Sequence, residues 1–291
     1  MGTRVRTDLC PGALRPWPAD DGLLVRLRLV GGRLPAVALS RLLEVSADFA
    51  DGRIRLTKRA NLQIRGLPGA AGQLAPAVLA ALETTGLLPS RSHELVRNIL
   101  VSPQTGYPGG LIDLRPVAAR LDTLLCDNPR LALLPGRFLF TLDDGRGDLL
   151  DRLTAAGRTG TDLGLIAVSG AEVQLRIGGQ WGEVVDVSDA AGRLAGLAAA
   201  FLTARGTGPD APWHVRELDT PLREAVPADQ RMPSWSCPLP YGPAAGGIHR
   251  NIPEGVLTPE LGHALLEIAG PDLVVTPWHG IFVPQPPEAT R

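Results

Sequence analysis

The sequence predicts an α+β fold in which one βαββ unit occurs twice, on either side of a single α/β middle domain. Three observations predict it. A strand–helix–strand–strand order is readable near the N-terminus, the same order returns at the C-terminus, and strand and helix signals alternate in between. The domain boundaries expected from this pattern are 1–90, 91–230 and 231–291.

The first unit begins with LLVRLRLV at 23–30, which is typical of a strand and stops at the Gly31–Gly32 pair. Helical spacing of apolar residues follows from 35 to 49. A turn then leads into the strand RIRLT, and NLQIRGL at 61–67 indicates the next strand. With helix-forming residues from 70 to 85, this is the order of a split-βαβ, ferredoxin-like unit.

The C-terminal segment repeats this order. Identical residues recur at a constant spacing of 223 positions: Gly32, Leu34, Leu42, Leu43 and Glu44 match Gly255, Leu257, Leu265, Leu266 and Glu267. After a contraction of four residues, DLVVTPWHGIFVP aligns with RIRLTKRANLQIR, which places Trp278 against Arg59. The pattern indicates an internal duplication, and two unrelated amphipathic helices of similar composition are the alternative.

The segment between the copies alternates strands with helices. ELVRNILVS, GRFLFTLD, LGLIAV and VQLRIGG have strand patterns, and helical spacing is found around 117–125 and over 190–204. The alternation predicts an α/β middle domain. A Pro-rich stretch from 209 to 243 is expected to cross back to the second copy.

Composition excludes several classes of protein. The 291 residues are 44% hydrophobic and 20% charged, with a formal net charge of -1, so the chain is globular and nothing favours nucleic acid or an anionic membrane as a partner. Three widely spaced cysteines predict no disulfide framework. Because the sequence has neither an N-terminal apolar segment nor an apolar run of about 20 residues, we expect a cytoplasmic protein.

Polar and apolar residues alternate in the stretch 53–65. Its odd positions carry Arg53, Arg55, Thr57, Arg59, Asn61, Gln63 and Arg65, and its even positions are apolar except Lys58. Because side chains alternate across a strand, the four guanidiniums are expected on one face of the sheet. Such cations repel one another unless anions bind, so the face is a candidate site for several carboxylates or phosphates. A solvated outer face with scattered acidic partners is the alternative.

Weaker candidates lie in the middle domain. Arg97 in ELVRNILVSP and Arg137 at the start of GRFLFTLD add cations, although an arginine at a strand end is usually an ordinary surface residue. Gly178 and Gly179 in RIGGQWG follow a strand, where backbone N–H groups can approach an anion closely. A tight hairpin explains these glycines at least as well.

The sequence contains no local metal or nucleophile motif. Its five histidines show no HxH, HExxH or HxxxH spacing, and GxSxG does not occur, so we expect no sequence-local metal site and identify no catalytic residue. If ligands converge in space, the candidates are His249, His279 and Asp143, because they stand at predicted strand ends.

Four segments, LTKRANLQIRGL, VRNILVSP, LPGRFLFTLDDG and RIGGQWG, resemble successive motifs of the nitrite/sulfite reductase superfamily. Within it, CPGALRPWPADDGLLVRLRLVGGRL and VVTPWHGIFVP look most like the precorrin-3B synthases. The resemblance implies a tetrapyrrole held between two ferredoxin-like halves and a nitrite/sulfite reductase-type middle domain. It also implies a cobalamin-pathway oxidoreductase that hydroxylates precorrin-3A with O₂ and forms a lactone.

The same resemblance implies a binding set for the tetrapyrrole. Arg59, Arg97 and Arg137 match three cations that hold the peripheral carboxylates of the macrocycle, and Leu139 stands where sulfite reductases have a further lysine. The full expected set is Arg55, Arg59, Asn61, Gln63, Arg65, Arg97, Asn98, Arg137, Gly178 and Gly179. The expected ligand is therefore a polycarboxylated tetrapyrrole.

One departure from the superfamily bears on the cofactor. The resemblance implies a 4Fe–4S cluster held by four cysteines after the second copy, whereas this chain has three cysteines, of which Cys10 is expected to be structural, and ends at Arg291. We therefore expect non-haem iron or a sirohaem-like tetrapyrrole instead, with an electron donor or a cluster-bearing partner chain. A redox-inactive tetrapyrrole carrier or accessory protein, and a cluster-free enzyme for another haem-like ligand, are the alternatives.

Overall fold

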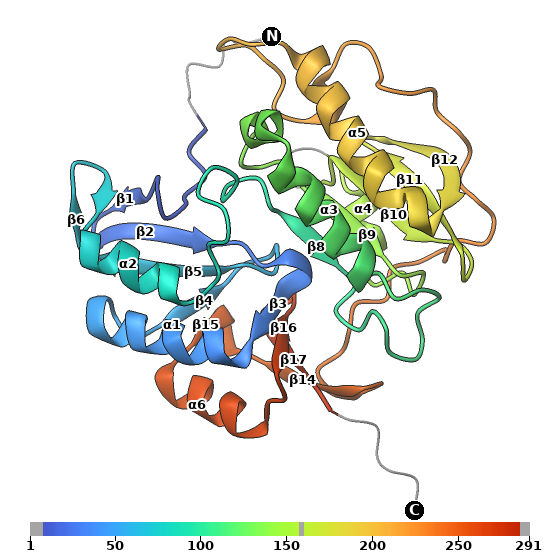
Figure 1. Cartoon of the computed structure of the whole chain (residues 1–291). Coiled ribbons are helices and arrows are strands. Elements are labelled where there is room, and N and C mark those ends of the chain that lie inside the picture. Colours follow the sequence, from blue (N-terminus) through green and yellow to red (C-terminus); the bar gives the residue numbers. More distant parts are fainter. Residues whose placement is uncertain (1–7, 157–159, 286–291) are drawn as a thin grey trace, which may run out of the picture. The chain divides into compact units, whose positions relative to one another are not determined.

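The chain folds into two compact units (Figure 1). The structure is a computed structural model that describes residues 8–156 and 160–285. The duplicated unit comprises Cys10–Glu94 and the chain from Leu239, and the middle unit comprises Leu95–Pro238 with Asp8 and Leu9. No helix within the described ranges is long and apolar enough to cross a membrane.

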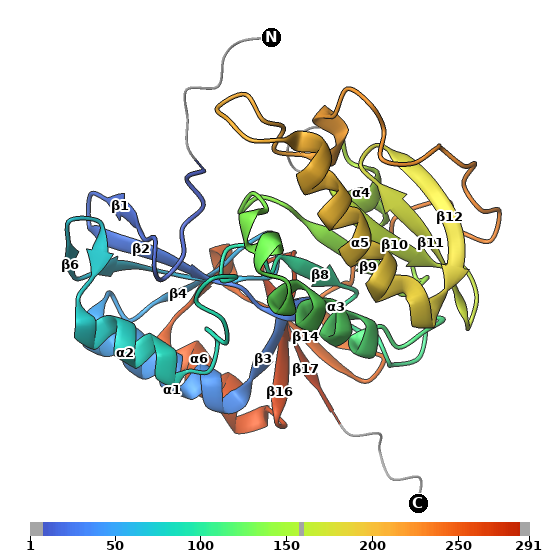
Figure 2. The same ribbon diagram turned by 45° about the horizontal axis from the view of Figure 1, so that its top comes forward.

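Two five-stranded sheets form the duplicated unit, with strand orders β1-β2-β5-β4-β15 and β13-β14-β17-β16-β3. Helices α1, α2 and α6 lie along one side of these strands (Figures 1 and 2). The elements from the first copy are β1 (Trp17–Ala19), β2 (Gly22–Leu27), β3 (Arg33–Pro35), α1 (Ala36–Phe49), β4 (Ile54–Leu56), β5 (Leu62–Leu67), β6 (Gly69–Ala70), β7 (Gln73–Leu74) and α2 (Pro76–Thr84). Those from the second copy are β13 (Gly242–Ala244), β14 (Gly247–Asn251), β15 (Val256–Leu257), α6 (Pro259–Ile268), β16 (Asp272–Val275) and β17 (Gly280–Pro284).

The two copies exchange one strand each. Strand β3 of the first copy pairs with β16 of the second, with Arg33 opposite Val274, while β15 of the second pairs with β4 of the first, with Val256 opposite Arg55. These two residue pairs are equivalent under the alignment of the copies. The predicted duplication is therefore confirmed as a pseudo-twofold pair of ferredoxin-like halves, each of which completes the sheet of the other.

Unusual backbone conformations recur at equivalent positions. Gly32 and Gly255 both have positive φ, +71° and +69°, in the turns that precede the exchanged strands. Ala60 and His279, which are equivalent only after the contraction of four residues, also adopt positive φ, at 53° and 60°. Because residues other than glycine seldom adopt this conformation, the second match supports the alignment across the contraction.

One predicted helix is wrong over its first part. Residues 70–75, which were expected to be helical, instead include the small β6–β7 hairpin, and Ala71 and Gly72 have φ of 51° and 74°. Helix α2 begins only at Pro76, which occupies its first turn. Proline is favoured at this position because its missing N–H would have no partner there. The proline, rather than the alanine content, sets the start of the helix.

A five-stranded mixed sheet forms the middle unit, in the order β12-β11-β10-β9-β8. Strands β8, β9 and β10 are parallel, and β11 and β12 continue antiparallel, while α3 and α5 pack on each other and on the sheet. The elements are β8 (Ile99–Val101), α3 (Arg115–Asp127), β9 (Phe140–Asp143), α4 (Leu150–Thr154), β10 (Leu163–Ala167), β11 (Glu172–Ile177), β12 (Gln180–Asp186) and α5 (Val187–Arg205).

Strands β8 and β9 are shorter than expected, so Arg97 and Arg137 precede them rather than lie within them. Every residue of β9 is buried, which leaves no exposed face. Arg137 therefore does not belong to an exposed polar face of β9. A central strand is covered on both faces, and its sequence need not alternate.

Candidate functional site

The alternation in the stretch 53–65 is confirmed. Its apolar residues Ile54, Leu56, Ala60, Leu62 and Ile64 are buried, whereas its polar residues are at least partly exposed except Asn61. The Oδ1 of Asn61 accepts a hydrogen bond from the backbone N–H of Leu29 at 2.9 Å, so this side chain ties the end of β2 to β5. Of the remaining polar side chains, those of Arg55, Gln63 and Arg65 lie on strands of the first sheet.

Two of these polar side chains, Gln63 on β5 and Arg55 on β4, lie in one row with Arg26 of the neighbouring strand β2, and we call the three the cation ladder. The Nη2 of Arg26 donates to the Oε1 of Gln63 at 3.2 Å. The Nη2 of Arg55 donates to Asp51 at 2.7 Å, while its buried Nη1 has no hydrogen-bond partner among the described residues. The ladder thus places two guanidiniums in one row on the partly exposed face of the first sheet, where they favour an anion.

Arg26 was not among the expected site residues. Its signal is the period of two in LLVRLRLV, which turns Arg26 toward the opposite face from Val25 and Leu27. That period gives no register between strands, so the sequence alone does not place Arg26 beside Gln63. The antiparallel pairing of β2 with β5 does so.

The other arginines of this face have different surroundings. Arg65 forms a bidentate ion pair with Asp21, with Nε–Oδ2 and Nη2–Oδ1 distances of 2.7 and 3.1 Å. Arg59 lies half-buried in the turn between β4 and β5, and its backbone N–H is 3.4 Å from the Oγ1 of Thr57. Arg55 therefore has an acidic partner at one of its nitrogens, and Arg65 has one at two nitrogens. For these two residues the structure agrees with the alternative of a solvated outer face with acidic partners.

The second copy replaces the cation ladder by apolar and aromatic groups. His249, Phe282 and Val274 take the places of Arg26, Gln63 and Arg55, in the same register. Trp278 takes the place of Arg59, and its ring meets that of His249 edge-on at a centroid distance of 6.3 Å. The two halves are therefore alike in backbone and opposite in chemistry.

The imidazole of His249 has a partner on each ring nitrogen. Its Nδ1 lies 3.0 Å from the carbonyl oxygen of Pro240, which can only accept, so Nδ1 carries the proton. Its Nε2 lies 2.9 Å from the Oγ1 of Thr276, whose hydroxyl also lies within hydrogen-bond distance, 3.2 Å, of the carbonyl oxygen of Gly280. Burial lowers the pKa of His249, because the charged imidazolium would lose its hydration.

Replacing His249 by glutamine should flatten the pH dependence of stability. Below about pH 6.5 an unfolded histidine binds a proton that the folded His249 with its lowered pKa does not, so the free energy of unfolding falls as pH falls. Urea denaturation between pH 5 and 7.5 measures this slope. His249→Gln is expected to reduce it, while His263→Gln, at an exposed position of α6, should leave it unchanged. An equal slope in His249→Gln and the natural chain would contradict the assignment.

In the middle unit, the expected site residues are engaged in local structure. Arg97 is 7% exposed and forms a bidentate ion pair with Asp122 of α3, with Nε–Oδ1 and Nη2–Oδ2 distances of 2.6 and 2.8 Å. The amide of Asn98 donates to the carbonyl oxygens of Leu95 and Gly136. These contacts position the chain before β8, and any ligand role of Arg97 and Asn98 stays a prediction.

Arg137 and the glycine pair complete the expected set. The guanidinium carbon of Arg137 lies 5.9 Å from the centroid of the Trp213 ring, a cation–π distance. Gly178 and Gly179 form the two-residue turn between β11 and β12, with Gly178 at φ 56°. The tight hairpin is therefore found, and the proposed approach of backbone N–H groups to an anion stays untested.

The strongest acidic cluster is also in the middle unit and includes one residue singled out from the sequence. Asp143 lies with Asp144 and Asp148 in the segment LDDGRGD, and no histidine or cysteine joins them among the described residues. Burial and the charge of Asp143 raise the pKa of Asp148 well above its usual range. Among the cysteines, Cys10 is buried, as expected.

Comparisons with known proteins agree with this architecture. Residues 18–83 match the nitrite/sulfite reductase ferredoxin-like half domain. A precorrin-3B synthase from Sinorhizobium sp. is 29% identical over 228 residues, which are 74% of this chain and 46% of that protein, so the chain spans about half the length of this curated relative.

A solved structure shares the fold. The Mycobacterium tuberculosis NirA protein matches with a TM-score of 0.68 at 16% identity, over 94% of this chain and 57% of that protein. The match to the half domain, the strands exchanged between the copies and the middle sheet all indicate the same fold. The chain therefore carries a half domain that matches the nitrite/sulfite reductase ferredoxin-like model over residues 18–83, and it resembles precorrin-3B synthases in sequence and the NirA protein in fold.

Proposed function

We propose that this chain is a precorrin-3B synthase-like oxidoreductase of cobalamin biosynthesis, and that its duplicated unit binds a polycarboxylated tetrapyrrole. The similarity to a precorrin-3B synthase supports the reaction class. The observation that carries the ligand class is the cation ladder, because it places the guanidiniums of Arg26 and Arg55 in one row on a partly exposed sheet face. Carboxylates are natural partners for guanidiniums arranged in this way.

The difference between the two copies supports a flat ligand with charged edges. The first copy has Arg26, Gln63 and Arg55 in one row, and at the same register the second has Val274, which is partly exposed, and Phe282, which is buried. A porphyrinoid has an apolar macrocycle and peripheral carboxylates. In the proposed complex the first copy binds the carboxylates, and the second contributes apolar surface.

The proposed reaction is an O₂-dependent hydroxylation of precorrin-3A. One oxygen atom of O₂ enters the macrocycle, the other leaves as water with two electrons and two protons from a donor, and a side-chain carboxylate closes a lactone. When bound, iron would supply the activation of O₂. The contribution proposed for this chain is to hold the carboxylates through Arg55, Arg59 and Gln63 and so orient the macrocycle.

A carrier or accessory protein without redox chemistry is the second candidate. Its supporting observation concerns possible metal ligands. Among the described residues, the cluster of three side chains that could hold a metal ion consists of Asp143, Asp144 and Asp148, and it contains none of the imidazoles that suit iron. Under this candidate the tetrapyrrole binds with the same affinity but is not oxidised.

Alanine at Arg55 should weaken tetrapyrrole binding about 10- to 100-fold, which corresponds to the loss of one charge-assisted hydrogen bond. Fluorescence titration with uroporphyrin, an octacarboxylate, measures the affinity. Uroporphyrin octamethyl ester should bind weakly to both the natural chain and Arg55→Ala, because its esterified carboxyl groups carry no charge. Arg33→Ala is the matched control, since Arg33 is an exposed arginine of the same unit, paired with Asp272. Equal losses in both variants would contradict the ladder as the binding face.

Turnover separates the two candidate functions. The chain is incubated with precorrin-3A, O₂ and a chemical reductant after reconstitution with iron, and the product is analysed by mass spectrometry. Incorporation of one atom from ¹⁸O₂ supports the oxidoreductase. Tight uroporphyrin binding with unchanged precorrin-3A supports the carrier.

A further inference from the structure

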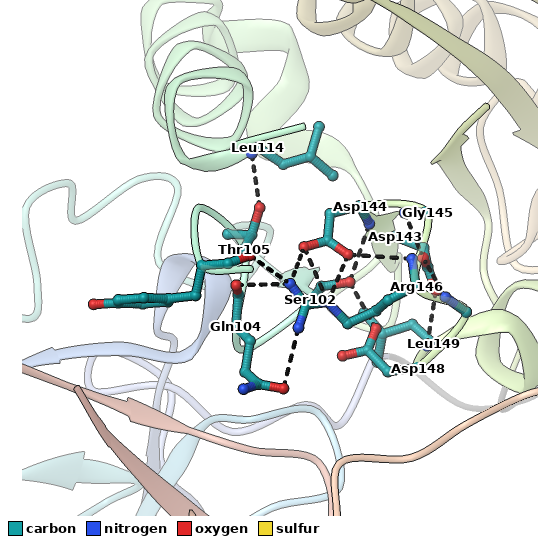
Figure 3. A network of polar contacts seen from close by, with 12 residues as sticks. Ser102, Gln104, Thr105, Leu114, Asp143, Asp144, Gly145, Arg146, Asp148 and Leu149 are labelled. Atoms are coloured by element: carbon teal, nitrogen blue, oxygen red, sulfur yellow. Dashed lines mark hydrogen bonds and ion pairs between the residues drawn. The ribbon is translucent and has the colours of Figure 1, made fainter. Parts of the chain in front are cut away.

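The acidic cluster of the middle unit takes no part in the proposed tetrapyrrole site. Asp143, Asp144 and Asp148 are 0%, 0% and 1% exposed, and one oxygen from each lies within 4.8 Å of the others. Figure 3 shows the three carboxylates gathered around Ser102 and Arg146. Carboxylates are seldom fully buried unless they are paired or coordinate a cation.

Two of these carboxylates have their hydrogen-bonding capacity largely filled by the protein. Asp144 accepts from Arg146, with Nε–Oδ1 and Nη2–Oδ2 distances of 2.8 Å each. Asp143 accepts three backbone N–H groups, from Gly145 and Gly147 on Oδ1 and from Leu149 on Oδ2. These contacts fix both carboxylates in place and leave the Oδ2 of Asp143 with one N–H only.

Asp148 differs from both. Its Oδ1 accepts from the hydroxyl of Ser102 at 2.7 Å, but its Oδ2 is buried and has no hydrogen-bond partner among the described residues. An ionised oxygen with no donor is among the costliest groups to bury. The guanidinium of Arg146 balances one of the three carboxylates and is already bound to Asp144. The cluster therefore lacks positive charge at the Oδ2 of Asp148.

We propose that this cluster binds a hard divalent cation, Mg²⁺ or Ca²⁺, with the Oδ2 of Asp148 as its principal ligand and Asp143 as the second. All the available ligand atoms are oxygens, which both ions prefer. The cation would join the loop after β9 to Ser102, which follows β8, so its effect is on the stability of the middle unit.

Calorimetry and thermal unfolding of the EDTA-treated chain test the site with MgCl₂ and CaCl₂, against NaCl at equal ionic strength. We expect saturable binding of one ion and a rise in the unfolding temperature of several degrees, which NaCl does not reproduce, because a ligand of the folded state stabilises it by mass action. Asp148→Asn should abolish both effects. Asp151→Asn, at an exposed aspartate of α4, should keep them.

Two results would overturn the proposal. The first is no divalent-specific heat or temperature shift in the natural chain, a comparison that needs no variant to fold. The second is that Asp148→Asn stabilises the metal-free chain but leaves its response to Mg²⁺ and Ca²⁺ unchanged, which means that the buried oxygen holds a proton instead of a cation.

Discussion

Replacing Gly32 by alanine is expected to lower the free energy of unfolding of the duplicated unit by about 4 kcal/mol, from backbone strain and steric overlap together. Gly32 has φ +71°, and a Cβ there would lie 2.1 Å from the carbonyl oxygen of Val275. Val275 belongs to β16, the strand with which β3 of the first copy pairs. The methyl group would therefore push apart the two strands that join the copies.

Gly72→Ala is the matched control for this prediction. Gly72 has a similar φ of +74°, but nothing lies within 4 Å of its Cβ position, so alanine there carries the backbone strain without the overlap, about 1 kcal/mol. Gly255→Ala should fall between them, because its nearest neighbour is the ring of His279 at 3.1 Å. Urea denaturation measures all three. If Gly32→Ala lowers the free energy of unfolding no more than Gly72→Ala does, the exchanged strands tolerate separation and the prediction is wrong.

Local patterns in the sequence were enough to predict the duplicated fold. The glycines at 32 and 255 and the leucines that follow recur because each copy needs the same turn and the same buried helix face. The alternation of 53–65 predicted which side chains are buried, because a strand has a period of two whatever its neighbours are. These signals lie within a few residues of one another in the chain.

Contacts between distant segments could not be predicted in this way. Arg26 faces Gln63 only through the register of β2 and β5, and Arg97 faces Asp122 only because α3 packs beside β8. The segment LDDGRGD shows three aspartates, but no sequence pattern reveals that one oxygen of Asp148 is buried without a donor. Tertiary pairing, rather than any local preference, decides each of these.

Removal of the Arg97 guanidinium is the second change with a large expected effect, a loss of about 3 kcal/mol in the free energy of unfolding of the middle unit. Arg97→Ala leaves the carboxylate of Asp122 without its bidentate partner. The side chain of Asp122 is 22% exposed, so water recovers part of the cost and the loss stays at the lower end for buried ion pairs. Arg137→Ala is the control, and loss of its cation–π contact should cost about 1 kcal/mol or less.

Asp122→Asn distinguishes a structural Arg97 from one that also binds ligand. The variant keeps the guanidinium of Arg97 but removes the anion that holds it. The free energy of unfolding should therefore fall whether or not Arg97 also binds ligand. If Arg97 also binds a carboxylate of the tetrapyrrole, it must exchange Asp122 for the ligand, and Asp122→Asn should tighten uroporphyrin binding several-fold by removing this competition. We expect this tightening. An affinity equal to that of the natural chain would leave Arg97 as a structural residue that ties the start of β8 to α3.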